Sequence, residues 1–338
     1  MALLSARKRW VMVCLLWHAA SHALACNADD RLTLQPVLPG VSVVHGSWPS
    51  VHAGGLAHAA TTVVLGEGAT VTVVDPGPSR QAGQALQNLL KCRQHARVVA
   101  VINTHAHAEQ VLANSAFRVS VAATAGTRLR MRQRCPDCLA AMKSDLGAAA
   151  LKGTRIVLPD QTLTDGHIVE IGGRSWQVVE VRDAHTESDL VLWSASDRLA
   201  VVGGLVDGAR LPVLAQGRVL GWLQALDKLQ AMQPQWLVGQ HLVSGPGQVR
   251  SALQVQRDYL CGLVRYAWQA LDRGWSEAEA INSLNLPERW AASSAAEHES
   301  RRQQHQFNQL RAWREMEVRW MDQQPQPDSC ALPPDIGR

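Results

Sequence analysis

Histidines follow three separate apolar runs in this chain, and this pattern limits the possible folds more than any other feature. The run RVVAVINT leads into His105 and His107, the run SWQVVEVRDA leads into His185, and the run QWLVGQ leads into His241. Short runs rich in Val and Ile and bounded by polar or turn residues are typical of buried strands. Because α/β sheets place their chemistry where strands end, we expect these histidines to converge.

The rest of the chain alternates β-rich blocks with helical blocks. We expect an α/β fold, an αββα sandwich of two packed mixed β-sheets with helices outside, within residues 26–245. A C-terminal helical extension is expected over residues 246–322 and a tail over residues 323–338. The segments behind this expectation are strands at 41–46, 61–66, 70–75, 97–105 and 235–241, a β-rich block at 154–204, and helical segments at 79–94, 108–150, 222–232 and 301–321.

The first 25 residues have the pattern of a secretory signal peptide. Positive residues 7–9 precede a short apolar run, and Ala23-Leu24-Ala25 fits a cleavage site. The run is too short to span a membrane, so we expect export to the periplasm and no span after cleavage. A lipoprotein attached at Cys26 is the less favoured alternative, because Ala23 stands where such sites favour Leu.

Cleavage would lower the net charge from +4 to +1, because the leader carries three positive residues and no acidic residue. Nothing then favours nucleic acid as a partner. Six cysteines would remain, of which Cys135 and Cys138 form a CPDC motif. A local disulfide between them is the favoured interpretation. A redox CxxC is the alternative, although no thioredoxin-like βαβ pattern frames it, and a zinc ribbon would need a second CxxC.

The histidines fit a zinc site. Neutral imidazole is a good ligand for Zn²⁺, and three protein ligands plus one water make an open tetrahedral site. Zinc in such a site lowers the pKa of its water to about 7. We predict His105, His107 and His185 as metal ligands. For each of these, and more so for His241, a hydrogen-bonded structural histidine is the alternative interpretation.

The pattern resembles the metallo-β-lactamase superfamily. The shared features are the THxH motif after a strand, a histidine 80 residues beyond His105, and a final histidine after a strand. A narrower resemblance is to the periplasmic quinoprotein relay system zinc metallohydrolases. It rests on the RLP motif at 210–212, the helix GWLQALDKL, the CPDC motif, and a C-terminal series of polar residues: His305, Asn308, Arg311, Glu315 and Glu317.

The superfamily resemblance implies an αββα sandwich, usually two zinc ions, and hydrolysis by a bridging hydroxide. The narrower resemblance implies a link to pyrroloquinoline quinone-dependent alcohol oxidation, with a periplasmic quinoprotein dehydrogenase or a c-type cytochrome as a possible protein partner. The small-molecule substrate is left open. The superfamily resemblance also implies that Asp75 supports the site loop by a hydrogen bond. A plain turn Asp before Pro76 is the alternative interpretation.

The chain departs from the family pattern at its second metal site. The positions that would hold the second zinc are occupied by Glu109, Gln110, Gly204 and His241, of which only the histidine is the expected ligand. Asp207 lies three residues from Gly204, an offset that changes its direction on a strand. We therefore expect one zinc ion and a degenerate second site.

Two functions remain open from the sequence. In the first, the protein is a mononuclear zinc hydrolase in which Glu109 acts as a general base or orients the water and His241 acts as an acid or binds substrate. In the second, it is a catalytically inactive pseudoenzyme that serves as a periplasmic binding or assembly partner.

Overall fold

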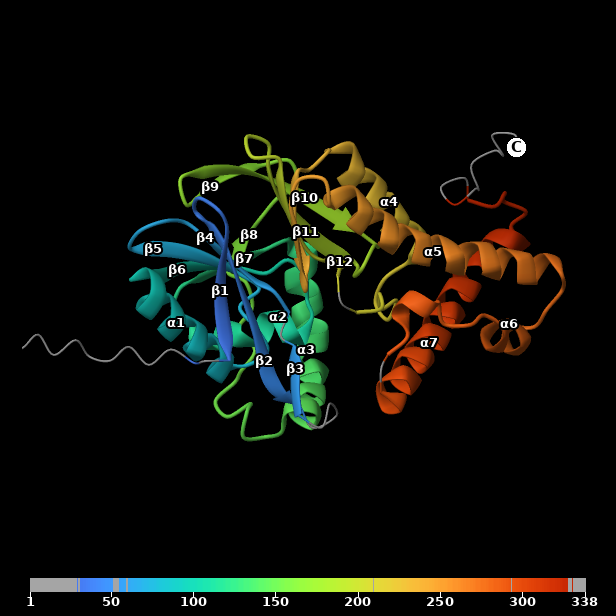
Figure 1. Cartoon of the computed structure of the whole chain (residues 1–338), viewed down its shortest axis with the longest axis horizontal. Coiled ribbons are helices and arrows are strands. Elements are labelled where there is room, and N and C mark those ends of the chain that lie inside the picture. The colour runs from blue at the N-terminus through green and yellow to red at the C-terminus, as the bar shows by residue number, and fades with distance from the viewer. Residues whose placement is uncertain are drawn as a thin grey trace, which may run out of the picture.

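The structure is a computed structural model that describes residue 29 and residues 31–50, 55–58, 60–208, 210–292, 294–327 and 330. The predicted signal peptide and Cys26 lie outside these residues, as does most of the predicted tail. In the part of the chain that is described, two mixed β-sheets pack together and helices cover both outer faces, so the predicted αββα sandwich is confirmed (Figure 1). No helix in these described segments is long and apolar enough to cross a membrane.

The first sheet combines an antiparallel half with a parallel half. Its strands run in the order β1-β2-β4-β5-β6-β7-β8, and β3 pairs with the far end of β2. The pairs from β5 to β8 are parallel, so β6 and its neighbours end at the same edge. The strands are β1 (Leu32–Leu38), β2 (Val41–Ser50), β3 (Gly55–His58), β4 (Thr62–Leu65), β5 (Thr70–Val74), β6 (Arg97–Ile102), β7 (Ser120–Ala123) and β8 (Gln161–Thr162).

The second sheet runs in the order β14-β13-β12-β11-β10-β9 and is antiparallel except for the β12–β13 pair. Strand β13 therefore delivers His241 to the end of the sheet where β12 also ends. The strands are β9 (Ile168–Ile171), β10 (Arg174–Arg182), β11 (Ser188–Ser194), β12 (Leu199–Asp207), β13 (Trp236–Gln240) and β14 (Leu242–Ser244).

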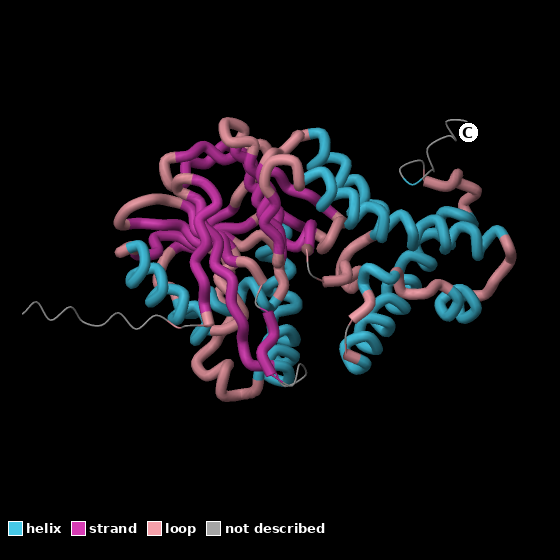
Figure 2. Tube along the Cα trace, in the orientation of Figure 1, coloured by secondary structure: helices cyan, strands magenta, loops and turns pink. Residues whose placement is uncertain are grey.

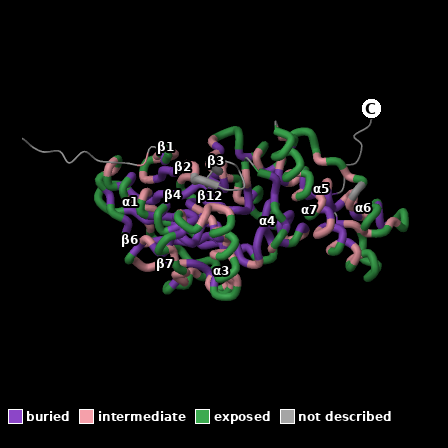
Figure 3. Tube along the Cα trace, turned by 90° about the horizontal axis from the view of Figure 1, so that it is seen from below, coloured by how far each residue is buried: buried purple, intermediate pink, exposed green. Residues whose placement is uncertain are grey.

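The central strands bury both of their faces, and successive residues of such a strand enter different cores. In β11, Leu190 and Leu192 belong to the core between the sheets, and Val191 belongs to the core under the outer helices. This is the two-residue period of a strand, applied to a sheet that is covered on both sides. Figure 3 shows the buried residues concentrated in the interior of the sandwich.

Helices close the sandwich from outside. Helix α1 (Arg80–Gln94) covers the first sheet with Leu86, Leu89 and Leu90, and helix α4 (Val219–Ala231) covers the second sheet with Trp222 and its neighbours. The loop that contains His105 and His107 is followed by α2 (Ala108–Val111), the 3₁₀ turn η1 (Leu112–Ala116) and, after β7, by α3 (Ala125–Leu146).

Three local expectations from the sequence were wrong or incomplete. The segment 108–150 was expected to be helical throughout, yet it contains β7, a four-residue strand too short to show a period. The segment 154–159 was expected to be a strand, yet it joins neither sheet. Its Ile156 and Leu158 instead pack beside α2 and α3, and its Val157 carbonyl accepts a hydrogen bond from Asn114. Strands β1 and β3 were not anticipated.

The regular elements described in the C-terminal part are helices joined by loops, as Figure 2 shows. Its long helices α5 (Val249–Asp272) and α7 (Ala295–Met321) pack against each other, with α6 (Glu277–Ser283) and the 3₁₀ turn η2 (Glu288–Trp290) between them in sequence. A disulfide joins Cys261 in α5 to Cys330. The predicted helical extension therefore forms a second packed layer outside α4.

One polar face of α7 fixes the loop that leads into α4, residues 210–218. Asn308 donates to the Pro212 carbonyl at 2.5 Å and accepts from the Leu214 amide at 3.0 Å. Glu315 accepts from the Val219 and Leu220 amides, which are otherwise unpaired at the start of α4. The polar series noticed in the sequence thus attaches the C-terminal helix to the sheet domain.

His305 belongs to the same polar series but has a structural role. Its Nδ1 lies 3.0 Å from the Tyr259 hydroxyl, and its ring is buried. Burial lowers the pKa of His305 to about 4, so the ring is neutral at pH 7.

We predict that Asn308→Ala lowers the free energy of unfolding by about 2–4 kcal/mol, because it leaves the buried Pro212 carbonyl and Leu214 amide without partners. Urea unfolding measures the change. The matched control is Gln303→Ala on the exposed face of α7, for which a change within about 0.5 kcal/mol is expected. Equal losses in the two variants would show that the contact between α7 and the 210–218 loop contributes little.

Candidate metal centre

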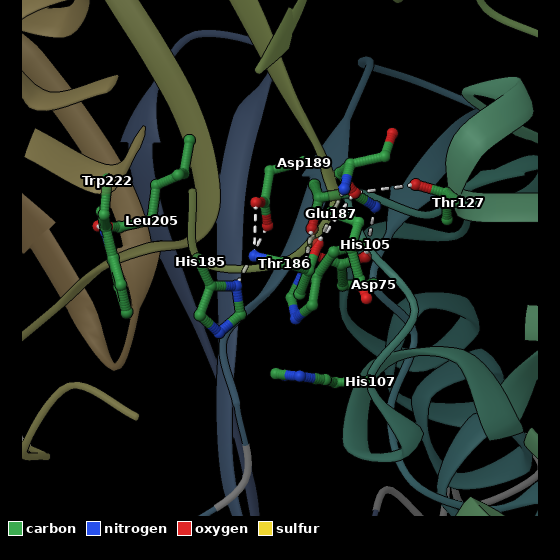
Figure 4. A network of polar contacts seen from close by, with 12 residues as sticks. Asp75, His105, His107, Thr127, His185, Thr186, Glu187, Asp189, Leu205 and Trp222 are labelled. Carbon is green, nitrogen blue, oxygen red and sulfur yellow. Dashed lines mark hydrogen bonds and ion pairs between the residues drawn. The ribbon is translucent and has the colours of Figure 1, made fainter. Parts of the chain in front are cut away.

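The three predicted ligands come from both sheets and meet at one edge of the sandwich. His105 and His107 lie in the loop between β6 and α2, and His185 lies in the turn between β10 and β11. Their ligand atoms all lie within 4.8 Å of one another. The ring centroids are 4.6–4.7 Å apart and each pair of rings is nearly perpendicular, as Figure 4 shows.

Hydrogen bonds fix the orientation of His105. Asp75 accepts from the Thr104 amide at 2.8 Å and from the Thr104 hydroxyl at 2.5 Å, which is the loop contact predicted for Asp75. The Thr104 hydroxyl therefore has its proton directed to Asp75 and can accept from His105 Nδ1, which lies 2.8 Å away. That tautomer leaves the lone pair on His105 Nε2, a buried atom with no hydrogen-bond partner among the described residues.

Two further contacts hold this loop in place. Asn103 and Asn114 exchange side-chain hydrogen bonds of 3.1 and 2.7 Å. The Leu190 amide of β11 donates to the Thr104 carbonyl at 2.8 Å, which links the loop to the second sheet.

His185 is oriented in the same way by a carboxylate. Its Nδ1 lies 3.0 Å from Asp189, whose other oxygen accepts from the Thr186 amide at 2.7 Å. The Trp222 indole packs edge-on against the ring at 5.1 Å and is itself anchored by a bond to the Leu205 carbonyl. Both His105 and His185 therefore keep Nε2 available for a metal.

His107 and Glu109 lie beside each other at the mouth of this cluster. His107 immediately precedes α2, and its Nδ1 lies 3.8 Å from the Glu109 carboxylate, beyond hydrogen-bond distance. The Glu109 side chain is 35% exposed, so its carboxylate is accessible to water. Glu109 thus stays near the cluster without belonging to it.

The surroundings of His105 and His107 favour the uncharged form of their imidazoles. Burial, reinforced by the other two rings, lowers the pKa of His105 well below its ordinary value. Burial likewise lowers the pKa of His107 to about 4. Metal ligation requires neutral imidazole, and at pH 7 these rings are already in that form.

Gly204 lacks a carboxylate, and the structure leaves no space for a side chain at this position. A Cβ atom at this position would lie 2.2 Å from His185 Cε1 and 2.5 Å from its Nδ1. The His185 ring therefore occupies the space that a side chain at position 204 would need. The bridging Asp expected from the family pattern has no room here.

The other second-site positions are also apart from the three-histidine cluster. The Gln110 side chain is buried, and its Oε1 has no hydrogen-bond partner among the described residues. His241 pairs through Nδ1 with Asp207 at 3.1 Å, which leaves its buried Nε2 without a described partner. Asp207 supports His241 and does not replace the missing carboxylate at Gly204.

The predicted disulfide between Cys135 and Cys138 is absent, since both residues are free thiols in this structure. They lie three residues apart within α3, where Cys135 is packed into the layer under Ala106 and Val111. Their thiols interact by a hydrogen bond in place of a covalent link.

Sequence reasoning missed the partners that orient the ligands. Asp189 follows His185 by four residues, and a carboxylate at that spacing in a turn was the available signal. The role of Trp222 and of the 210–218 loop had no such signal. The Arg218 amide bonds to the Ala184 carbonyl, and Gly217 packs so closely that a Cβ there would lie 2.1 Å from the same oxygen.

The residues present fit a zinc ion. Three imidazoles converge, two of them with Nδ1 already bonded, and His105 Nε2 is buried with no described partner. An unpaired buried polar atom carries a free-energy cost that a bound cation would remove. The nitrogen-only ligand set suits zinc better than Mg²⁺ or Ca²⁺.

Comparisons with known proteins agree with this geometry. The sequence profile of the metallo-beta-lactamase superfamily matches residues 54–241, which end at His241. Among curated proteins, none matches this chain in sequence.

Solved structures share the fold at low identity. A metallo-beta-lactamase from Pontibacter korlensis is 16% identical, with a TM-score of 0.55 over 68% of this chain and 98% of that one. One from Hirschia baltica is also 16% identical, with a TM-score of 0.53 over 68% and 97%. The metallo-beta-lactamase FIM-1 from Pseudomonas aeruginosa, in its mono-zinc form, is 14% identical, with a TM-score of 0.55 over 70% and 99%.

We predict that Gly204→Ala weakens zinc binding by about 10–100-fold, because the added methyl group displaces the His185 ring. Competition with a chromogenic zinc chelator measures the affinity. The control is Gly262→Ala in α5, where a Cβ meets nothing within 4 Å, and its affinity should match that of the unmodified protein. An unchanged affinity in Gly204→Ala would mean that the ring can move without loss.

We also predict that the metal-free protein loses stability as the pH falls from about 6.5 to 4. The unfolded chain has a His107 pKa near 6.5 and the folded chain about 4, so the unfolded state binds more protons in this range. Urea unfolding midpoints at several pH values measure the effect. His107→Gln should flatten the dependence, and a parallel fall in the variant would assign the effect to other groups.

Proposed function

Because the chain belongs to the metallo-beta-lactamase superfamily, we propose that it is a metal-dependent hydrolase with a single zinc site formed by His105, His107 and His185. The observation that carries this proposal is the orientation of the imidazoles. Asp75, acting through Thr104, and Asp189 hold two of the rings with Nε2 available. Hydrogen bonds that fix the tautomers of the ligands in this way are typical of metal sites.

Different residues have different roles in this proposed site. When bound, zinc would polarise a substrate carbonyl and make water more acidic. Asp75 and Asp189 keep the ligand tautomers fixed, and Trp222 prevents the His185 ring from swinging outward. The 210–218 loop holds the His185 backbone.

Two groups are suited to proton transfer in the proposed reaction. Glu109 keeps a carboxylate beside His107, where it can accept a proton from water or orient it. His241 has Nδ1 paired with Asp207, which fixes its ring, and we assign it the role of an acid or of a substrate contact. These are the roles that the sequence suggested for both residues.

A second function, a binding or assembly role without catalysis, is favoured by Gly204. The absent carboxylate and the His185 ring in its place remove part of the two-metal machinery usual in the family. In that case zinc would be structural or absent.

We place either function in the periplasm, next to a quinoprotein dehydrogenase or a c-type cytochrome. The support is the leader-like pattern of residues 1–25 and the resemblance of the C-terminal polar series to the quinoprotein relay group.

The test is zinc content and hydrolysis in the same preparations. We expect about one zinc per chain and metal-dependent hydrolysis of generic lactam or thioester substrates. Both should be lost in His105→Ala and kept in His298→Ala, which changes an exposed histidine on α7. Two zinc ions per chain would contradict the single-site proposal. Zinc binding without turnover, or protein without zinc, would contradict the hydrolase and favour the binding role.

A further inference from the structure

The dithiol in α3 lies directly behind the loop that carries the metal ligands. Cys135 packs in one cluster with Ala106, the residue between His105 and His107. Cys138 is packed partly against the same cluster and partly against Ala108 and Leu112, in and just after α2. Neither thiol takes part in the proposed hydrolysis, so the pair is unexplained by it.

The two thiols differ sharply in access. Cys135 is fully buried, with 0% exposure, whereas Cys138 is only partly buried. A reagent from solution can therefore reach Cys138 first. Three other cysteines, Cys92, Cys261 and Cys330, are disulfide-bonded, which makes this pair the exception among the described cysteines.

The hydrogen bond between the thiols favours the same order of reaction. It lowers the pKa of the Cys138 thiol, because the Cys135 S–H can donate to a Cys138 thiolate. Burial and the neighbouring carboxylates of Glu109 and Asp137 oppose that effect. The same bond and burial raise the pKa of Cys135, which keeps its proton on.

We propose that Cys135 and Cys138 form a reversible dithiol–disulfide couple, in which the partly exposed Cys138 is the attacking thiol and the buried Cys135 is the resolving thiol. The co-reactant is a disulfide, either of a small thiol such as glutathione or of a protein.

The chemistry balances in two exchange steps. The Cys138 thiolate attacks one sulfur of the incoming disulfide, forms a mixed disulfide and releases one thiolate. Cys135 then loses its proton and attacks Cys138 Sγ, which forms the Cys135–Cys138 bond and releases the second thiolate. The protein pair gives up two electrons, and the incoming disulfide is reduced to two thiols.

The helix places the two cysteines close to disulfide geometry. Residues three apart in an α-helix lie on one face with Cα atoms about 5 Å apart, inside the range that disulfides require. Their Cβ atoms lie about 5–6 Å apart in a regular helix, so closing the bond draws this turn of α3 slightly together. Because Cys135 supports Ala106, the oxidation state changes the packing behind the metal loop.

The test uses the full-length protein equilibrated in mixtures of reduced and oxidised glutathione, quenched with acid, alkylated and analysed by peptide mass spectrometry. We expect the Cys135–Cys138 pair to convert between dithiol and disulfide while Cys261–Cys330 stays oxidised. Cys135→Ser should accumulate glutathione on Cys138. Cys138→Ser is the matched control and should leave the buried Cys135 unmodified.

A second measurement needs no variant. In the unmodified native protein, iodoacetamide should label Cys138 about tenfold or more faster than Cys135. Equal labelling, glutathione on Cys135 in Cys138→Ser, or a pair that remains dithiol in oxidised glutathione would each overturn the proposal. None of these readouts depends on zinc or hydrolysis, so the result is independent of the proposed function.

Discussion

The burial of three imidazoles against one another is the constraint on which the rest of the site depends. Rings this close cannot all carry protons, and burial keeps His105 and His107 neutral. Neutral rings with unpaired nitrogens still lack the hydrogen bonds that water would provide. Each surrounding contact, from Asp75 through Thr104 to Asp189, fixes where the remaining lone pairs point. The arrangement is polar, is supported by two aspartate side chains and is suited to a cation.

Both sheets and the C-terminal helices are needed to reach this arrangement. The first sheet provides two of the histidines and the second provides the third, and the Leu190 amide joins them through the Thr104 carbonyl. The 210–218 loop then holds the His185 backbone from outside, and α7 holds that loop. A segment outside the family match thus supports a ligand inside it.

The sequence was most informative where a residue's role depends on its local pattern. The histidines at strand ends could be identified because apolar runs predict buried strands. The sandwich was predicted from the alternation of β-rich and helical blocks. What could not be predicted depends on contacts between distant segments. Gly204 could be read as a missing ligand, but the fact that the His185 ring fills its space comes only from the packing of β12 against that turn. The cysteine pair was misjudged because spacing alone does not distinguish a thiol pair from a disulfide.

The contacts of α7 also make the support of the metal loop depend on the last part of the chain. Asn308 and Glu315 bind groups that precede them by 94 to 96 residues. A chain cut before α7 keeps all three histidines but lacks these side chains, so the 210–218 loop behind His185 loses part of its support. Damage at the C-terminus would therefore reach a ligand that lies far away in the sequence.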